Sequence, residues 1–252
     1  MSAHKLDVMA VVAEAYRGAW THFSEMFRLI WLPGGAYILL SVGSLFLDPK
    51  QDTFEIMLVE LGSLFLWPII AVTWHRFILL GDEPSGRINF HFGRREARFL
   101  LVTIMLSLFM VPGLLCFLLA GAMAQAQQGS PVSGVVAVIG LGLLLAGVFF
   151  FVRLSLLLPA VAVDDTVNAG RMLERTKGNF WRLLGVAFLS ALPLFAIFIL
   201  LSFLPLALKA LGSAIVMLFY AIVNVAILSI AYRELSGPAG THAPEPEVDA
   251  TL

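Results

Sequence analysis

Two arginines, Arg76 and Arg153, have surroundings that call for a chemical explanation. Each is followed by a run of apolar residues before the next acidic residue appears. An unpaired guanidinium within a membrane costs at least ~2.5–3.5 kcal/mol, so we expect each to have a partner. The planar guanidinium group of either arginine could bind a carboxylate, such as Asp164 or Asp165, if a bend at Pro159 brought that residue back. A lipid phosphate would be an equally suitable partner. The alternative is that both side chains only extend along apolar surface to reach water.

A second group of arginines alternates with aromatic residues and forms a basic-aromatic cluster. At a membrane surface such a cluster predicts contact with anionic lipid headgroups rather than with nucleic acid. Arg182, which follows Trp181 at the start of another apolar run, is a further candidate for binding lipid or another anion. The cluster consists of Arg94, Arg95 and Arg98 with Phe90, Phe92 and Phe99.

The sequence offers no motif for a cofactor, a metal ion or a catalytic group. The five histidines are scattered, there is one cysteine, and no glycine-rich phosphate loop or nucleophile elbow occurs. Glu55 and Glu60 are five residues apart, which places them about 140° apart around a helix and on different faces. His75, beside Trp74, fits an amphipathic side chain at headgroup depth. We therefore predict no cofactor, no metal site and no catalytic residue.

The elements that must position these side chains are apolar helices. Of the 252 residues, 60% are hydrophobic and 13% are charged, and the mean hydropathy is +0.92. Soluble domains carry about 25% charged residues, so much of this surface must face lipid. We predict an all-α polytopic membrane protein with six transmembrane helices arranged as three hairpins. The predicted spans are residues 29–47, 57–80, 99–120, 132–157, 183–205 and 210–232.

Amphipathic patterns predict two interfacial helices beside these spans. Residues 5–28 place aromatic and aliphatic side chains on one face, and a second helix is expected over 166–177. Asp165 could cap the second helix and Gly178 could end it. Together these elements make one membrane domain over 1–235, followed by a disordered cytoplasmic tail over 236–252.

The basic residues predict the orientation. All of the 16 lysines and arginines except Lys50 and Lys209 fall on one side of the six-span arrangement. Basic residues near span ends stay cytoplasmic, so both termini are expected in the cytoplasm of a bacterial inner membrane.

Each predicted hairpin begins with a basic, aromatic-bearing element that contains Arg28, Arg98 or Arg182. Arg17 and Arg28 match Arg171 and Arg182 at the same spacing, which favours three degenerate repeats. The alternative is that the positive-inside rule alone collects arginines at these ends.

Four segments carry a resemblance to a known group of proteins. They are WHRFILLGDEP (74–84), RLSLLLPAVAVDD (153–165), RTKGNFWRLLG (175–185) and AYRELSG (231–237). They resemble six-helix bacterial inner-membrane proteins, which are similar to the membrane domain of some glycerophosphodiester phosphodiesterases and to YciC-type proteins. The resemblance covers most of residues 10–237 and implies a helical bundle. It implies no activity, because the soluble catalytic domain of the phosphodiesterases has no counterpart here.

These observations favour a non-enzymatic membrane protein that contacts anionic lipid on its cytoplasmic side. Its role would be membrane or envelope organisation, or partnership with a membrane protein that the sequence does not identify. One alternative is a small transporter with Arg76 and Arg153 at an anion site. Another is a membrane-embedded lipid-modifying enzyme, which would need an acid–base pair at matching depth.

Overall fold

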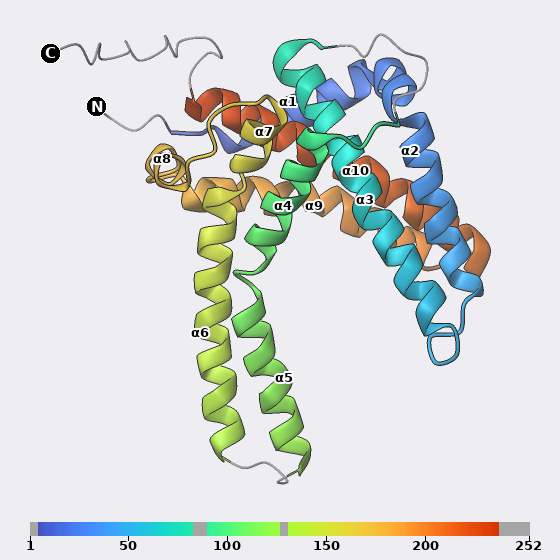
Figure 1. The fold of residues 1–252 in the computed structure, drawn as a ribbon, viewed down its shortest axis with the longest axis vertical. Coiled ribbons are helices and arrows are strands. Elements are labelled where there is room, and N and C mark those ends of the chain that lie inside the picture. The colour runs from blue at the N-terminus through green and yellow to red at the C-terminus, as the bar shows by residue number, and fades with distance from the viewer. Residues whose placement is uncertain (1–4, 83–89, 127–130, 237–252) are drawn as a thin grey trace, which may run out of the picture.

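A computed structural model describes residues 5–82, 90–126 and 131–236, and the regular structure in these ranges is helical (Figure 1). The elements are α1 (Val8–Thr21), α2 (Phe23–Gly43), the 3-10 turn η1 (Ser44–Phe46), α3 (Thr53–Leu80), α4 (Arg94–Ser107), α5 (Val111–Ala126), α6 (Pro131–Leu154), α7 (Leu157–Ala162), α8 (Ala169–Arg175), α9 (Phe180–Leu201) and α10 (Leu206–Ser236).

The predicted all-helical, membrane-type architecture is confirmed, with five or six helices that could cross a bilayer. Five helices are each long and apolar enough to cross a bilayer, when α2 is taken together with η1 and α6 is taken together with α7. A sixth results if α4 and α5, which are bent by 46° at a short break, form one span.

Prolines interrupt two of the predicted spans. The predicted helix over 99–120 is two helices, because Pro112 lacks the N–H that would bond to the Leu108 carbonyl. Turns in which each N–H bonds to the carbonyl three residues earlier bridge this break. The last of these bonds runs from the Val111 N–H to the Leu108 carbonyl at 3.2 Å. The predicted helix over 132–157 ends at Leu154, and Pro159 lies in the first turn of the next helix, α7.

The predicted interfacial helices also have different bounds. Residues 5–28 form α1 and the start of α2, because the chain leaves helical geometry at His22 (φ −100°, ψ 29°). The helix expected over 166–177 is the shorter α8, capped by Asn168, whose side chain accepts from the Arg171 N–H at 3.0 Å. Asp165, the predicted cap, accepts from Thr166 and Tyr232 instead. Gly178 lies in the left-handed region (φ +78°) after α8. Apart from Ser236, the predicted tail lies outside the described residues.

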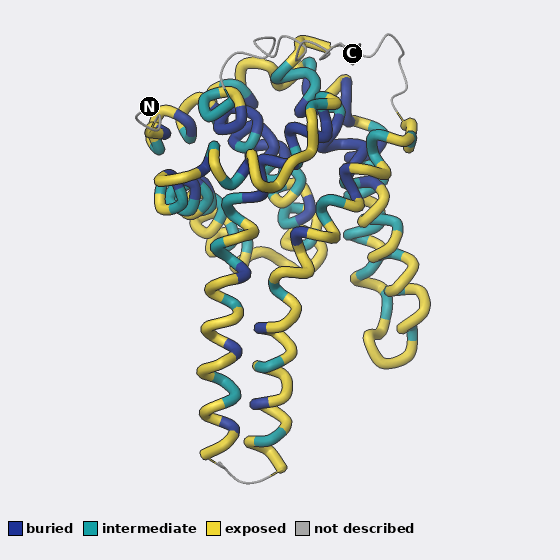
Figure 2. Tube along the Cα trace, turned by 60° about the vertical axis from the view of Figure 1, so that its left-hand side comes forward, coloured by how far each residue is buried: buried dark blue, intermediate teal, exposed yellow. Residues whose placement is uncertain are grey.

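The helices form a bundle from which one pair projects. Consecutive helices pack as the pairs α2–α3, α5–α6 and α9–α10, and α10 also contacts α1, α2, α3 and α7. The α5–α6 pair projects away from the other helices (Figure 1). Buried residues concentrate where the other helices meet, whereas the projecting pair is largely exposed (Figure 2). Its side chains include Leu118 and Val138, each 70% exposed. An apolar surface of this kind indicates contact with lipid.

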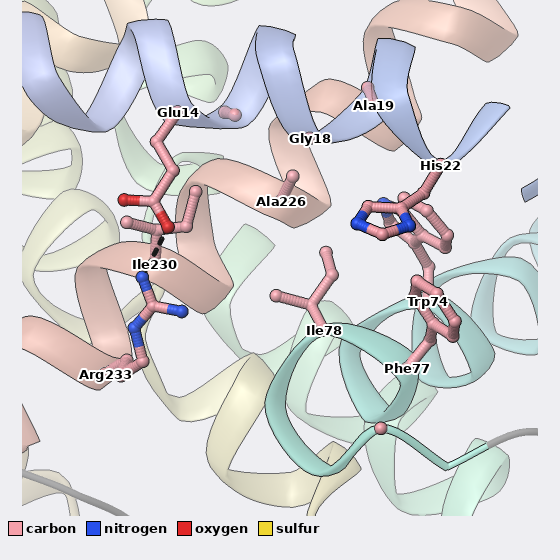
Figure 3. A pocket seen from close by; sticks show the side chains of 12 residues that line it. Glu14, Gly18, Ala19, His22, Trp74, Phe77, Ile78, Ala226, Ile230 and Arg233 are labelled. Atoms are coloured by element: carbon pink, nitrogen blue, oxygen red, sulfur yellow. Dashed lines mark hydrogen bonds and ion pairs between the residues drawn. The ribbon is translucent and has the colours of Figure 1, made fainter.

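Helix α1 lies across α10 and α9, at the end of the molecule opposite the tips of α5 and α6 (Figure 1). It contacts α10 and α9, and buries Val11, Ala15 and Ala19 at 0% exposure. Figure 3 shows α1 passing over α10 and the end of α3, with its Glu14 paired to Arg233 of α10. The face of α1 that points into the protein therefore carries small side chains, which allow a close approach to α10.

The contact between α5 and α6 depends on glycine. A Cβ added at Gly113 would lie 2.7 Å from the backbone nitrogen of Leu144, whereas a Cβ at Gly142 would meet nothing within 4 Å. We expect Gly113→Ala to lower the free energy of unfolding by ~1–3 kcal/mol, because the two backbones must separate.

Gly142→Ala is the matched control and should be neutral or slightly stabilising, because alanine favours a helix. Thermal unfolding of the purified protein in detergent measures both variants. Equal effects of the two substitutions would contradict the proposed backbone contact.

Candidate functional site: the arginine-rich helix ends

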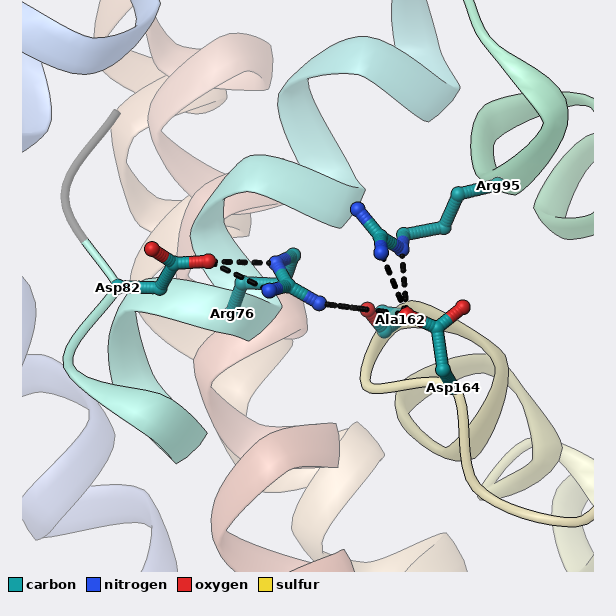
Figure 4. A network of polar contacts seen from close by, with 5 residues as sticks. All are labelled: Arg76, Asp82, Arg95, Ala162 and Asp164. Atoms are coloured by element: carbon teal, nitrogen blue, oxygen red, sulfur yellow. Dashed lines mark hydrogen bonds and ion pairs between the residues drawn. The ribbon is translucent and has the colours of Figure 1, made fainter. Parts of the chain in front are cut away.

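Arg76 lies near the end of α3 and binds carboxylates from two directions. Gly81 (φ +65°) ends α3 in the left-handed region, after which Asp82 accepts from Arg76 Nε at 2.9 Å and from Nη2 at 2.5 Å. Nη1 donates to the carbonyl of Ala162 at 3.3 Å and lies 3.6 Å from Asp164 Oδ2 (Figure 4). The predicted return of an acid after Pro159 therefore brings Asp164 to Arg76.

Asp164 has an unusual backbone conformation. It ends α7 with φ +58°, the one non-glycine residue with positive φ among those the structure describes. Its N–H bonds to the carbonyl of Val161 at 3.2 Å, and the next N–H bonds to that of Ala160 at 2.9 Å. This is a Schellman ending, in which glycine is the usual residue. A carboxylate at this position has a use that glycine lacks, because it lies between two guanidinium groups.

Arg95 supplies the second guanidinium. Its Nε and Nη2 lie 2.9 Å and 2.5 Å from Asp164 Oδ2 (Figure 4). The hydrogen bond from Arg95 and the positive charges of Arg95, Arg76 and Arg98 hold the pKa of the Asp164 carboxyl below its ordinary value. The network thus joins the end of α3, the start of α4 and the turn after α7.

Arg153 joins α6 to the region around α8 and makes no contact with this network. Its Nε donates to Thr176 Oγ1 at 3.2 Å, and its Nη2 donates to the carbonyl of Leu173. The guanidinium carbon also lies 5.2 Å from the centre of the Phe149 ring, within range of a cation–π contact. Arg76 and Arg153 therefore bind different parts of the protein rather than a common site.

Arg182, at the start of α9, fixes the N-terminal segment. Its Nη1 donates to the carbonyl of Leu6 at 2.6 Å, while the Leu6 N–H donates to the Asn179 side chain at 3.0 Å. Leu6 is completely buried and Asn179 is 1% exposed. Both backbone polar groups of a buried residue are thereby satisfied, which positions the start of α1 against α9.

Arg94 and Arg98 are the two candidates that remain exposed. They lie one turn apart on α4, so they share a face, whereas Arg95 points to Asp164. Among the described residues, none of the ion pairs includes either of them. Their guanidinium groups therefore lie at the surface of the described part of the chain.

Several polar contacts at this end were not predicted from the sequence. His75, expected at headgroup depth, is completely buried, with Nδ1 2.7 Å from Ser229 Oγ. Ser229 already donates to the Val225 carbonyl, so His75 Nδ1 is the donor in this pair. The Tyr232 hydroxyl donates to Asp165. A hydrophobic pattern carries no signal for such pairs, because their members lie far apart in the sequence.

The exposed guanidinium groups of Arg94 and Arg98 give this end of the molecule a positively charged surface. Among the described residues, no three His, Cys, Asp or Glu side chains are arranged to hold a metal ion. Comparison of the chain with family models, with curated proteins and with solved structures finds no match.

The Asp164 carboxylate should stabilise the protein in a pH-dependent way. Because its pKa is lower in the folded state than its ordinary value of 3.8, its contribution is present above that pH and is lost as the pH falls through the folded-state pKa. Asp164→Asn should lower the free energy of unfolding by up to ~1 kcal/mol at about pH 7, a size typical of partly exposed ion pairs.

As the pH falls below 3.8, the difference between wild type and Asp164→Asn should shrink, because the carboxyl takes up a proton first in the unfolded chain and only at lower pH in the folded protein. Asp164→Gly serves as a control for the backbone, since it removes the same charge but relaxes the left-handed conformation. A loss for Asp164→Asn that stays constant from pH 7 to pH 3 would rule out the ion-pair explanation.

The N-terminal attachment can be tested separately. Asn179→Ala leaves the buried N–H of Leu6 without an acceptor, which costs ~1–3 kcal/mol. We expect faster proteolysis within α1 under native conditions, and Lys177→Ala, at an exposed position nearby, should leave the rate unchanged. An unchanged rate for Asn179→Ala would show that other contacts hold α1 in place.

Proposed function

We propose that this chain is a non-enzymatic integral membrane protein that binds anionic phospholipid headgroups through Arg94 and Arg98. In this proposal the apolar helices form three membrane hairpins, and the arginine-rich ends face the cytoplasm of a bacterial inner membrane. The protein would organise the membrane locally or hold a partner membrane protein in an anionic lipid environment.

The contrast among the candidate arginines carries this proposal. Arg76, Arg95, Arg153 and Arg182 donate to groups within the chain, so most of their hydrogen-bonding capacity serves the fold. Arg94 and Arg98 are exposed on one face of the first turns of α4. A guanidinium fork binds phosphate in a bidentate manner, and two of them one helical turn apart suit a phosphodiester surface.

Exposed aromatic side chains support a bilayer interface near the helix ends. Trp20, at the end of α1, is 77% exposed, and Trp181, at the start of α9, is 78% exposed. Tryptophan is enriched at the headgroup level, where its ring is partly in apolar surroundings.

The state of the carboxylates favours binding over catalysis. Asp164 is an ion-pair partner with a lowered pKa, so it remains ionised at neutral pH and is a weak general acid or base there. Its fixed geometry suits a structural role in holding α4, and with it Arg94 and Arg98, at the helix ends.

Removal of the two exposed guanidinium groups should weaken retention of anionic lipid. Each basic residue near an anionic surface contributes about 1 kcal/mol, so Arg94→Gln with Arg98→Gln should reduce retention of phosphatidylglycerol or cardiolipin ~10- to 30-fold. Native mass spectrometry of the protein in detergent, with defined added lipids, measures this ratio. The wild-type retention should also fall with ionic strength.

Lys50→Gln with Lys209→Gln is the matched control, because it removes the same charge from the predicted opposite side. This pair should leave retention of anionic lipid unchanged. Equal losses for both double variants, or no loss for either, would refute the assignment of Arg94 and Arg98.

A further inference from the structure

A cavity of about 370 Å³ lies where α1 crosses α3 and α10 (Figure 3). Ala15, Gly18 and Ala19 from one face of α1 line it, together with Ala226 of α10. A Cβ added at Gly18 would meet no atom within 4 Å. The small side chains therefore leave a space that the protein itself does not fill.

The two ends of this cavity differ in chemistry. The ion pair between Glu14 and Arg233, at 2.5 Å, lies at one end, and both side chains are about half exposed. His22 and Trp74 lie at the other end, with the apolar side chain of Ile78 between the two ends (Figure 3). The cavity thus offers one charge of each sign, an apolar middle and an aromatic end.

Trp74 forms a buried aromatic wall at the His22 end of the cavity. It lines the cavity and is 1% exposed, and its indole Nε1–H has no hydrogen-bond partner among the described residues. A buried tryptophan N–H is usually bonded, because leaving it without an acceptor is unfavourable. The nitrogen itself has less than 1 Å² of exposed surface, so it offers no donor to a molecule in the cavity.

We propose that this cavity binds one phospholipid with a phosphoethanolamine headgroup. The headgroup phosphate would accept from Arg233, its ammonium would donate to Glu14, and the apolar part of the lipid would pack on Ile78 and Trp74. A zwitterionic headgroup complements the neighbouring charges of Glu14 and Arg233, whereas a purely anionic one would be repelled by Glu14. This site is separate from Arg94 and Arg98.

Exposed aromatic residues near α1 indicate how the bound lipid is oriented. Trp20 and Phe23, which follow the cavity toward α2, are 77% and 49% exposed. Exposed aromatic side chains of this kind favour the lipid side of an interface. The acyl chains therefore leave the cavity at the His22 end, and the headgroup lies at the charged end.

Retention of defined lipids tests the proposal. Purified protein in detergent is mixed with phosphatidylethanolamine, phosphatidylcholine or phosphatidylglycerol, and retained lipid is measured by native mass spectrometry. We expect one tightly held phosphatidylethanolamine per chain, and weaker retention of phosphatidylcholine, whose methylated ammonium has no N–H to donate to Glu14.

Two variants locate the site. Gly18→Leu fills the cavity and should abolish the tightly held lipid, whereas Gly18→Ala, which fits the open space, should retain it. Glu14→Gln removes the partner of the ammonium and should reduce the preference for phosphatidylethanolamine over phosphatidylglycerol about tenfold, the effect of one charged hydrogen bond.

Melting temperatures show whether each variant is folded. If Gly18→Leu does not fold, the effect of Glu14→Gln on lipid preference tests the proposal. The proposal is overturned if folded Gly18→Leu retains phosphatidylethanolamine as the wild type does, or if Glu14→Gln leaves the lipid preference unchanged. It is also overturned if the wild type retains phosphatidylethanolamine no better than phosphatidylcholine. Neither of these two lipids carries a net charge that Arg94 and Arg98 would bind, so this proposal and the proposed function can fail independently.

Discussion

The structure depends on the cost of placing guanidinium groups at the ends of apolar helices. A charge that leaves water needs both an opposite charge and hydrogen-bond acceptors. Arg76 has both, from Asp82, Asp164 and the carbonyl of Ala162. These partners come from two segments of the chain, so satisfying the arginine also fixes the turn after α7 against the end of α3.

This constraint explains why a strained residue occurs in an otherwise regular helix ending. The left-handed conformation costs an L-residue roughly 1–2 kcal/mol, and aspartate tolerates it better than most. At Asp164 the carboxylate repays this cost by binding Arg95 and Arg76. Glycine would remove the strain but would leave two guanidinium groups without this partner.

Buried polar contacts distinguish two regions of the molecule. The helices that meet around α10 carry buried polar side chains, including His75, Ser229 and Thr176, and each of these has a hydrogen-bond partner. The projecting α5–α6 pair is held by close backbone contact at Gly113, and its outer surface is apolar. The first region therefore has a fixed arrangement, and the second is suited to lipid.

The sequence predicted features that depend on local pattern. Long apolar runs predicted helices of membrane-spanning length. A return of Asp164 or Asp165 to Arg76 or Arg153 was one of the alternatives that the sequence left open, and the structure shows it for Asp164 and Arg76. The pairing of Asp164 with Arg95 was not predicted, because Arg94, Arg95 and Arg98 form one cluster and the sequence pattern does not show which of them points into the protein. The breaks at Pro112 and His22 were also missed, since apolar composition continues through them and hydropathy does not register a missing N–H.

The first turns of α4 show why exposure, rather than residue type, separates the roles of these arginines. Arg94, Arg95 and Arg98 are chemically equal and nearly adjacent, yet helix geometry turns Arg95 toward Asp164 and leaves the other two on a common outer face. The ion pair of Arg95 fixes the orientation of the helix start. It thereby determines where the exposed pair points, so the structural arginine positions the two that are proposed to bind lipid.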